Sequence, residues 1–384
     1  MGLIPGEDYL RLIVPELPEL LLVRYRLLRR INYASPAGRR SLAAYFQVGE
    51  KVLRRELDTL REQGLIHVEQ RGISLTPAGE TLVHAITPYL RLLLGLDTME
   101  KELLKLLKVK RVSVVPGDLE KDEVVLLEMG RAAAKILREC LKPEIVLAVS
   151  GGMSCAAVAD MLPDLSAPPG ITVVPARGGL GEEVDYQANN IAARVARKLK
   201  AGYRLLHLPD SLSQEALEML LHEEKIAEIL ELINSASVLL HGIGTAGDMA
   251  RRRGAEEEEI RMLEAKGAVG EVFGFFFNAR GEIVDCIPSL GLYLEDMSNR
   301  VDNVIVVAGG SAKAEAIIAV VGNHPRDHLV LDEGAARQIM ALGGVDVQGL
   351  APELILDLQY PNESKVKSQM SRLNNVKCRK SRSF

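Results

Sequence analysis

The sequence predicts an α/β protein with an N-terminal winged helix-turn-helix followed by a large Rossmann-like domain. Three observations lead to this fold class. Within residues 35–79, two short amphipathic helices separated by a three-residue break precede an alternating segment. From Val109 onward, short apolar runs alternate with amphipathic helices, as in a mainly parallel sheet covered on both faces. Three of the apolar runs end directly in glycine-rich turns.

Composition places the chain among large globular proteins. Its 384 residues are 47% hydrophobic and 26% charged, which is enough for two or more domain cores. No apolar run reaches the roughly 18–20 residues that span a bilayer, and the acidic, proline-containing N-terminus is unlike a secretory signal. The cysteines form no CxxC motif and no Cys/His cluster, so we expect a cytoplasmic protein without disulfides, metal or cofactor. They are Cys140, Cys155, Cys286 and Cys378.

Charge is distributed unevenly along the chain. The net charge is −5, yet residues 24–61 hold ten Lys or Arg against three Asp or Glu. A basic segment on an acidic body predicts a module that faces a polyanion.

This basic segment has the element order of a winged helix-turn-helix. Apolar residues recur at helical spacing, a cap signal starts the second helix, and Gly64 follows the third. The residues that follow alternate like a two-stranded wing. The expected elements are helix 20–31, helix 35–46, helix 50–63 and wing 65–79. The apolar face expected for the third helix is Val52, Leu53, Leu57 and Leu60.

The third helix is expected to enter the major groove of double-stranded DNA with its first turns. Lys51, Arg54 and Arg55 would then reach base edges or phosphates. Arg39 and Arg40, at the start of the preceding helix, would lie near the DNA backbone. A small helical domain with a solvated charged face is the alternative.

Three glycine turns of the large domain are candidate anion sites. They are residues 150–154, 241–245 and 308–313, each directly after a predicted strand. Glycine lets the backbone approach an anion, and the helix that follows offers free N–H groups and its positive dipole end. None matches the GxxxxGK[ST] nucleotide loop or a Rossmann fingerprint. The set therefore favours a phosphorylated small molecule over a dinucleotide, although each turn alone could simply reverse the chain.

Charged residues occur where such a ligand needs them. Arg177 lies at a strand end, Arg251–Arg253 follow the second turn, and Lys313 closes the third. A sugar bisphosphate needs two cationic pockets, and Gln187 and Glu271 are candidates for its hydroxyls. Ordinary surface ion pairs remain the alternative for each of these charges.

The sequence resembles the SorC/DeoR-type bacterial sugar-responsive regulators over roughly residues 15–340. The family joins a winged helix-turn-helix to an effector domain similar to sugar-phosphate isomerases and deaminases. This resemblance implies a repressor that forms dimers and tetramers and releases its operator DNA when a sugar phosphate binds. The most similar members control glycolytic genes and imply fructose 1,6-bisphosphate as effector. The segments that carry the resemblance are GRRSLAAYF, VPARGGLGEEVDYQAN, HGIG, FGFFFNARGE and VAGGSAKAEAI.

The resemblance also implies roles for individual residues. The first glycine turn would hold one phosphate, and the remaining residues would surround the sugar and the other charges. These positions are Gly151, Gly152, Met153, Ser154, Arg177, Gln187, Arg252, Arg253, Glu271 and Lys313. The most similar members carry two threonines where this chain has Met153 and Ser154, so one hydroxyl is lost and one retained.

Two other functions compete with the repressor. An isomerase or deaminase with an added DNA-binding domain would need an acid/base pair beside the phosphate. No spacing singles out such a pair among Asp185, Asp248, Glu271 and Asp285. A DNA-binding assembly protein is the third possibility.

We expect four segments along the chain. Residues 1–86 form the winged helix-turn-helix domain, and 87–108 a leucine-rich linker helix that pairs with its copy or packs in a core. Residues 109–342 form the sugar-phosphate-binding and oligomerisation domain, and 343–384 a disordered basic tail. The linker helix is the element expected to move when the effector binds.

Overall fold

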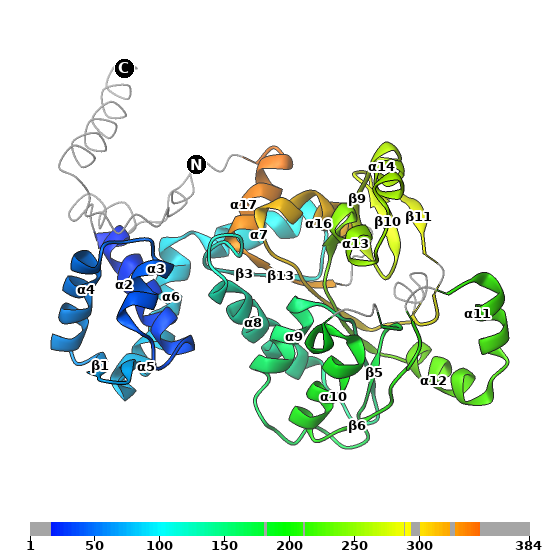
Figure 1. Cartoon of the computed structure of the whole chain (residues 1–384), viewed down its shortest axis with the longest axis horizontal. Helices are drawn as coiled ribbons and strands as arrows, with labels where there is room; N and C mark the ends of the chain where they lie inside the picture. Colours follow the sequence, from blue (N-terminus) through cyan, green and yellow to red (C-terminus); the bar gives the residue numbers. More distant parts are fainter. Residues whose placement is uncertain are drawn as a thin grey trace, which may run out of the picture. The chain divides into compact units, whose positions relative to one another are not determined.

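The computed structural model describes residues 17–179, 183–209, 212–287, 289–292, 300–322 and 327–345 (Figure 1). The chain divides into two compact units, with the boundary between Gly95 and Leu96. Among the described residues, no helix has both the length and the apolar character needed to cross a membrane. The predicted basic tail falls almost entirely outside these residues.

The first unit confirms the winged helix-turn-helix. Its wing is an antiparallel pair in which Ile66 lies opposite Leu75 and Glu69 opposite Gly72. An isolated bridge between Ala37 and Ile73 ties the wing to the turn between the first two helices. The elements are α2 (Leu17–Tyr33), α3 (Arg39–Tyr45), α4 (Glu50–Glu62), β1 (Ile66–Glu69), β2 (Gly72–Leu75), α5 (Pro77–Ala85) and α6 (Thr87–Leu93).

Helix α4 packs by one narrow stripe. Leu53, Leu57 and Leu60 are buried, at the i, i+4, i+7 spacing that keeps side chains on one helix face. Val52, which we expected on this face, is 37% exposed. The prediction for Val52 is wrong because adjacent helical residues point about 100° apart.

Part of the positive charge of this unit is used inside it. Glu56 is buried, and one of its oxygens accepts a hydrogen bond from Nε of Arg24 at 3.0 Å. Arg29 is 1% exposed, and its guanidinium lies 5.6 Å from the centre of the Tyr25 ring. The local excess of Lys and Arg therefore overstates the charge that this unit can present to a ligand.

The second unit is built on a seven-stranded sheet in the order β3-β13-β12-β7-β4-β5-β6. Every neighbouring pair is parallel, which confirms the predicted fold class. The strands are β3 (Arg111–Val115), β4 (Val146–Val149), β5 (Thr172–Pro175), β6 (Gly202–Tyr203), β7 (Val238–His241), β12 (Asn303–Val307) and β13 (Asp327–Asp332).

Helices cover this sheet on both faces (Figure 1). One face carries α8, α9 and α10, whose buried residues share one hydrophobic cluster with β4, β5 and β7. The other face carries α7, α16 and α17. The helices are α7 (Leu96–Leu107), α8 (Val124–Cys140), α9 (Met153–Met161), α10 (Ala188–Leu199), α11 (Gln214–Leu221), α12 (Glu224–Asn234), α16 (Ala314–Val321) and α17 (Glu333–Leu342). A 3-10 turn, η1 (Val184–Tyr186), precedes α10, and another, η2 (Ser311–Lys313), precedes α16.

A second, antiparallel sheet lies beside the first in the order β11-β10-β9-β8. Its strand β9 packs against α13 and against α16, the helix that follows β12 of the large sheet. The elements are β8 (Gly244–Thr245), α13 (Ala246–Arg252), α14 (Glu257–Ala265), β9 (Ala268–Val272), β10 (Phe275–Asn278) and β11 (Ile283–Cys286).

The expected linker helix of residues 87–108 is two helices, so the prediction of one continuous helix is wrong. Helix α6 ends at Leu93 and α7 begins at Leu96, with Gly95 between them at a φ of 66°. This left-handed conformation suits glycine, which has no Cβ to clash. Helix α7 packs against β3 and α17 and thus belongs to the core of the second unit.

The strand order creates a switch point between β4 and β7. The chain leaves β4 toward β5 and β6, whereas it leaves β7 in the opposite direction, toward β12 and β13. The loops after these two strands therefore diverge and open a crevice at the carboxyl ends of the sheet. Open α/β sheets bind their ligands at such a point.

Candidate ligand-binding and DNA-binding sites

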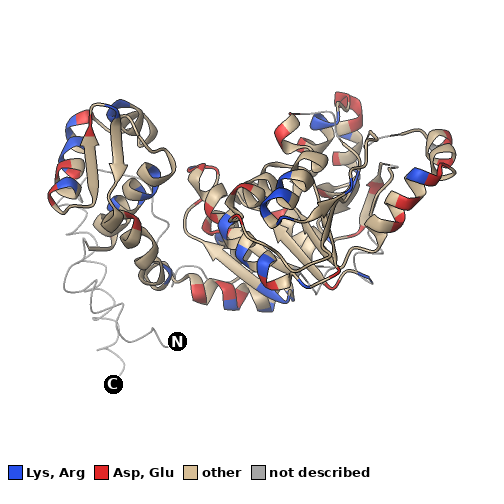
Figure 2. Ribbon diagram, turned by 90° about the horizontal axis from the view of Figure 1, so that it is seen from below, with Lys and Arg blue, Asp and Glu red and all other residues tan. Residues whose placement is uncertain are grey.

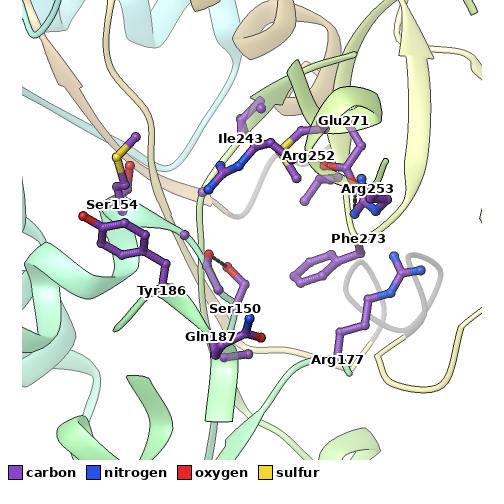
Figure 3. A pocket seen from close by; sticks show the side chains of 18 of the residues that line it. Ser150, Ser154, Arg177, Tyr186, Gln187, Ile243, Arg252, Arg253, Glu271 and Phe273 are labelled. Atoms are coloured by element: carbon purple, nitrogen blue, oxygen red, sulfur yellow. Dashed lines mark hydrogen bonds and ion pairs between the residues drawn. The ribbon is translucent and has the colours of Figure 1, made fainter. Parts of the chain in front are cut away.

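A cavity of about 140 Å³ opens at the carboxyl ends of four adjacent strands, β12, β7, β4 and β5 (Figure 3). The loop after each strand contributes to it, and the hairpin β9–β10 of the small sheet closes one side. The structure brings together every residue that we predicted to hold the ligand. These are Gly151, Gly152, Met153, Ser154, Arg177, Gln187, Arg252, Arg253, Glu271 and Lys313.

The first glycine turn leaves the N-terminus of α9 open. Gly152 has a φ of 105°, which only glycine adopts without strain, and no side chain caps the helix. The N–H of Gly152 donates to the carbonyl of Tyr186 at 2.8 Å, and a Cβ on Gly151 would lie 2.8 Å from the same oxygen. The free amides of the first turn of α9 and its dipole thus border the cavity.

The helix that follows the second glycine turn, α13, already has a side-chain cap. The Thr245 side chain accepts a hydrogen bond from the backbone N–H of Asp248 at 3.2 Å at the start of α13. The Thr245 hydroxyl in turn donates to a carboxylate oxygen of Asp248 at 2.7 Å. Gly242 and Gly244 still line the cavity, so this turn contributes its backbone surface and shape.

The third glycine turn holds carboxylates of the chain itself. The Gly310 N–H donates to Asp332 at 3.0 Å, and the Ala312 N–H donates to Glu120 at 2.7 Å. Glu120 also accepts a hydrogen bond from the Ser311 hydroxyl at 2.9 Å. Of the three candidate anion turns, this one therefore has two of its amides already occupied by carboxylates of the chain itself.

Lys313 is the part of the third turn that reaches the cavity. Within the part of the chain that the structure describes, its ammonium makes no hydrogen bond and no ion pair. Burial lowers the pKa of Lys313 below its usual 10.5; Asp248 opposes this shift, and Arg252 adds to it. A partly buried ammonium with such a pKa gains from an anionic partner.

The arginines around the cavity are held in place by the fold. Nη2 of Arg253 lies 2.8 Å from Oε1 of Glu271; the Glu271 side chain is buried, and that of Arg253 is 10% exposed. Arg177 is 7% exposed, and its Nη2 donates to the Ile287 carbonyl at 3.0 Å. Such fixed guanidinium groups are preorganised for a planar or tetrahedral anion.

Glu271 has one committed and one available oxygen. Oε1 accepts hydrogen bonds from Arg253 and from the backbone N–H of Gly274. Among the described residues, no partner is found for Oε2. Glu271 thus positions an arginine and a turn while keeping an acceptor for a hydroxyl group.

Sequence reasoning missed Phe273, which also lines the cavity. With Gly274 it forms the two-residue turn between β9 and β10, since Val272 pairs with Phe275. Both turn residues have a positive φ, 52° and 77°, as in a type I′ turn. A non-glycine residue in this region costs on the order of 1–3 kcal/mol. The signal in the sequence was the dipeptide Phe-Gly between two apolar strands, where Asn-Gly is usual.

The acids considered for catalysis do not gather in the cavity. Among the described lining residues, only Glu271 of the four is found. Asp285 pairs with Lys266, and Asp248 accepts a hydrogen bond from the hydroxyl of Thr245, the N-cap residue of α13. Asp185 lies in the short turn η1.

The residues predicted to contact DNA all lie at the surface of the first unit. Arg39 and Arg40 begin α3, and Lys51, Arg54 and Arg55 occupy the first turns of α4; all five are exposed. Figure 2 colours all Lys and Arg residues of the described ribbon blue, including those on the helices of this unit.

Their ion pairs are loose. Nε of Arg40 lies 3.7 Å from Glu50, and Nε of Arg54 lies 3.8 Å from Asp58. Exposed pairs of this kind contribute little to stability, so these side chains can exchange their partners for phosphates.

A winged helix-turn-helix joined to an α/β domain with a cationic cavity at its switch point defines a ligand-responsive DNA-binding regulator. Comparison with known families agrees with this class. Residues 20–90 match the family model described as "CggR N-terminal DNA binding domain", and residues 93–341 match "Putative sugar-binding domain".

Individual relatives extend over most of the chain. The central glycolytic genes regulator of Bacillus subtilis is 41% identical over 327 residues, which are 84% of this chain and 96% of the relative. The regulator of the same name from Priestia megaterium is 41% identical over 332 residues, 86% of this chain and 96% of the relative. The crystal structure of a "putative SorC family transcriptional regulator" from Enterococcus faecalis is 39% identical, with a TM-score of 0.59, and covers 63% of this chain and 99% of that chain. The chain belongs to the SorC/DeoR family of sugar-binding, DNA-binding transcriptional regulators.

Proposed function

We propose that the protein is a repressor of glycolytic genes that releases its operator when a phosphorylated sugar, most specifically fructose 1,6-bisphosphate, binds the cavity. The observation that carries this proposal is the joining of the uncapped N-terminus of α9 with Lys313 and three arginines in one cavity. These groups suit a ligand with more than one phosphate. The names of the two bacterial relatives support the choice of target genes.

The cavity suggests a place for each part of such a ligand. One phosphate binds the amides of α9 at Gly151–Ser154, where the Ser154 hydroxyl adds a donor. Lys313 neutralises ligand charge, and the two arginines of the small-sheet side, Arg252 and Arg253, hold sugar or phosphate. Oε2 of Glu271 accepts a hydrogen bond from a hydroxyl group of the sugar. The remaining polar groups of the site are Arg177 and Gln187.

Binding without catalysis is the function that the carboxylates favour. General acid–base chemistry on a sugar phosphate needs two positioned proton-transfer groups beside the reacting carbon. Glu271 spends one oxygen on Arg253 and Gly274, and the cavity offers no second acid among the described residues that line it. We therefore propose a sensor that needs no cofactor.

The response to ligand requires that the two states of the protein bind it with different affinity. We place the start of the switch at the turn that carries Lys313. Glu120 and Asp332 tie this turn to the loop after β3 and to the start of α17. Both β3 and α17 pack against α7, the first helix of the unit. A shift of Lys313 toward a phosphate can thereby reach α7.

Assembly with further copies completes the proposal. Two winged helices are needed to read two half-sites of an operator, which implies at least a dimer. Helix α6 exposes Tyr89 and Leu92, at 69% and 44%, and offers apolar surface for such a contact. The operator contacts themselves are assigned to Arg39, Arg40, Lys51, Arg54 and Arg55.

A ligand panel on the full chain tests the proposed function. We expect fructose 1,6-bisphosphate to raise the melting temperature by mass action and to lower affinity for an operator fragment selected from a random DNA pool. Other phosphorylated sugars serve as competitors, and product formation is followed on the same panel. Turnover of any member would favour the enzyme, and absence of any stabilisation would favour the assembly protein.

Proton uptake on binding is expected from the state of Lys313. Its folded pKa lies below 10.5, and a bound phosphate would raise it again, because the anion favours the charged form. Binding should therefore take up protons at alkaline pH, and affinity should fall as pH rises through the pKa of the free protein. Phosphate monoesters are fully ionised above about pH 8, since their second pKa is about 6. Calorimetry between about pH 8 and 10, in buffers of different ionisation enthalpy, measures this uptake, and Lys313→Met should remove it.

A further inference from the structure

The turn between β9 and β10 carries a bulky aromatic residue in a position that disfavours it. A type I′ turn needs positive φ at both central residues, which Asn and Gly tolerate and Phe does not. Phe273 nevertheless adopts a φ of 52° here. A residue that keeps such a conformation against its own preference points to a role for its side chain.

The surroundings hold the turn in this conformation from several sides. The Gly274 N–H donates to Oε1 of Glu271, the same oxygen that binds Arg253. A Cβ on Gly274 would overlap the guanidinium of Arg177, so the glycine lets this arginine pack onto the turn. The Phe273 ring lies 5.3 Å from the ring of His241 at an interplanar angle of 52°. Two charged residues thus hold the turn at Gly274, and one aromatic neighbour contacts the Phe273 ring.

The ring is directed into the ligand cavity. Figure 3 shows it pointing to the interior, with Ser150 on one side and Arg177 on the other. Its neighbours in the lining include Ile243 and Val272, so an apolar surface lies among the cationic groups. A phosphate has no use for such a surface. The carbon skeleton of a sugar does, because its C–H groups carry partial positive charge and pack on the negative face of an aromatic ring.

We propose that Phe273 is a specificity-determining residue that packs against the C–H face of the sugar and distinguishes a phosphorylated sugar from other phosphates. This inference rests on the proposed ligand-binding function of the cavity. In this assignment the α9 turn and the cationic side chains bind the phosphate groups. The β9–β10 turn recognises the carbon skeleton of the sugar. The strained turn serves to place the ring beside the apolar side chains of Ile243 and Val272, among the cationic groups of the cavity.

The test compares two probes, fructose 1,6-bisphosphate and inorganic phosphate, on the full chain. Phe273→Leu keeps an apolar side chain and the same backbone demand while it removes the aromatic face. We expect the Kd for the sugar bisphosphate to rise about 3- to 10-fold, the range of a lost aromatic contact, and the Kd for inorganic phosphate to change less than about 2-fold. Calorimetry, with phosphate also measured by competition, gives both constants.

Two further variants make the result decisive. Phe276→Leu is the matched control, since Phe276 is buried in the adjacent strand and does not line the cavity. In this variant the ratio of the Kd for the sugar bisphosphate to the Kd for inorganic phosphate should equal that of the wild type. Phe273→Asn suits the turn and serves if the leucine variant does not fold; it should lose sugar affinity in the same way. Equal weakening of both probes, or no weakening of either, in a folded Phe273 variant would overturn the proposal. If the wild-type protein binds neither probe, the proposed function fails instead.

Discussion

Replacing Lys313 by methionine should abolish most of the response to sugar phosphate and leave operator binding in the absence of ligand intact. Methionine keeps the apolar stem and removes only the charge. A charge-assisted hydrogen bond to phosphate contributes about 1.5–3 kcal/mol, so the ligand Kd should rise about 10- to 150-fold. Calorimetry with fructose 1,6-bisphosphate and operator binding with and without the sugar measure the two properties separately.

Stability distinguishes this loss from simple damage to the fold. The pKa of Lys313 is lowered mainly by burial, so the folded protein holds the ammonium at an energetic disadvantage. The variant should therefore melt at the wild-type temperature or above it. Lys266→Met is the matched control, because Lys266 pairs with Asp285 at the surface and does not line the cavity. A Lys313 variant that responds normally to ligand would remove this residue from the site.

Arg54→Ala should weaken operator binding without changing affinity for the sugar phosphate. The Arg54 side chain is 71% exposed on the second turn of α4, where a recognition helix meets the major groove. A contact to a base should cost about 1–3 kcal/mol and relax specificity at one position, whereas a contact to phosphate should lower the salt slope by about one. Binding measured at several salt concentrations separates the two.

Arg61→Ala provides a closely matched control for this experiment. Arg54 and Arg61 both lie on α4 and both approach the carboxylate of Asp58, at 3.8 and 3.3 Å. Only Arg54 belongs to the N-terminal half of the helix. We expect Arg61→Ala to leave operator affinity nearly unchanged, and an equal loss in both variants would show that general charge, rather than the placement of α4, accounts for binding.

Much of the fold was predictable because it depends on local patterns. Helical spacing, glycine breaks and strand alternation predicted the winged helix, and repeated strand–helix units predicted the parallel sheet. The errors at Val52 and at Gly95 are of one kind. In both, apolar residues were assigned to a single continuous feature, whereas the packing of each helix decides which face is buried and where the helix ends.

The candidate site was predictable as a set of residues. Parallel strands bring their carboxyl ends to one edge, so residues after β4, β5, β7 and β12 meet even though up to about 160 positions separate them in the sequence. Their roles within the site were not predictable. Which glycine turn is open depends on Glu120 and Asp332, and Glu120 lies 191 positions before the serine that it binds.

The sequence by itself determined the two-domain class, the family and a set of charged, glycine and polar residues that line the cavity, since these depend on periodicity, motif and resemblance. Only the tertiary structure decided that, among the described residues, the amides of the α9 turn have no side-chain acceptor whereas amides of the other two turns do. It alone also decided that Glu271 shares one oxygen between an arginine and a backbone amide, and that Phe273 enters the cavity. The reason is physical. A donor or an acceptor is available to a ligand only when no other part of the folded chain has already satisfied it, and the partners that do so here come from distant segments.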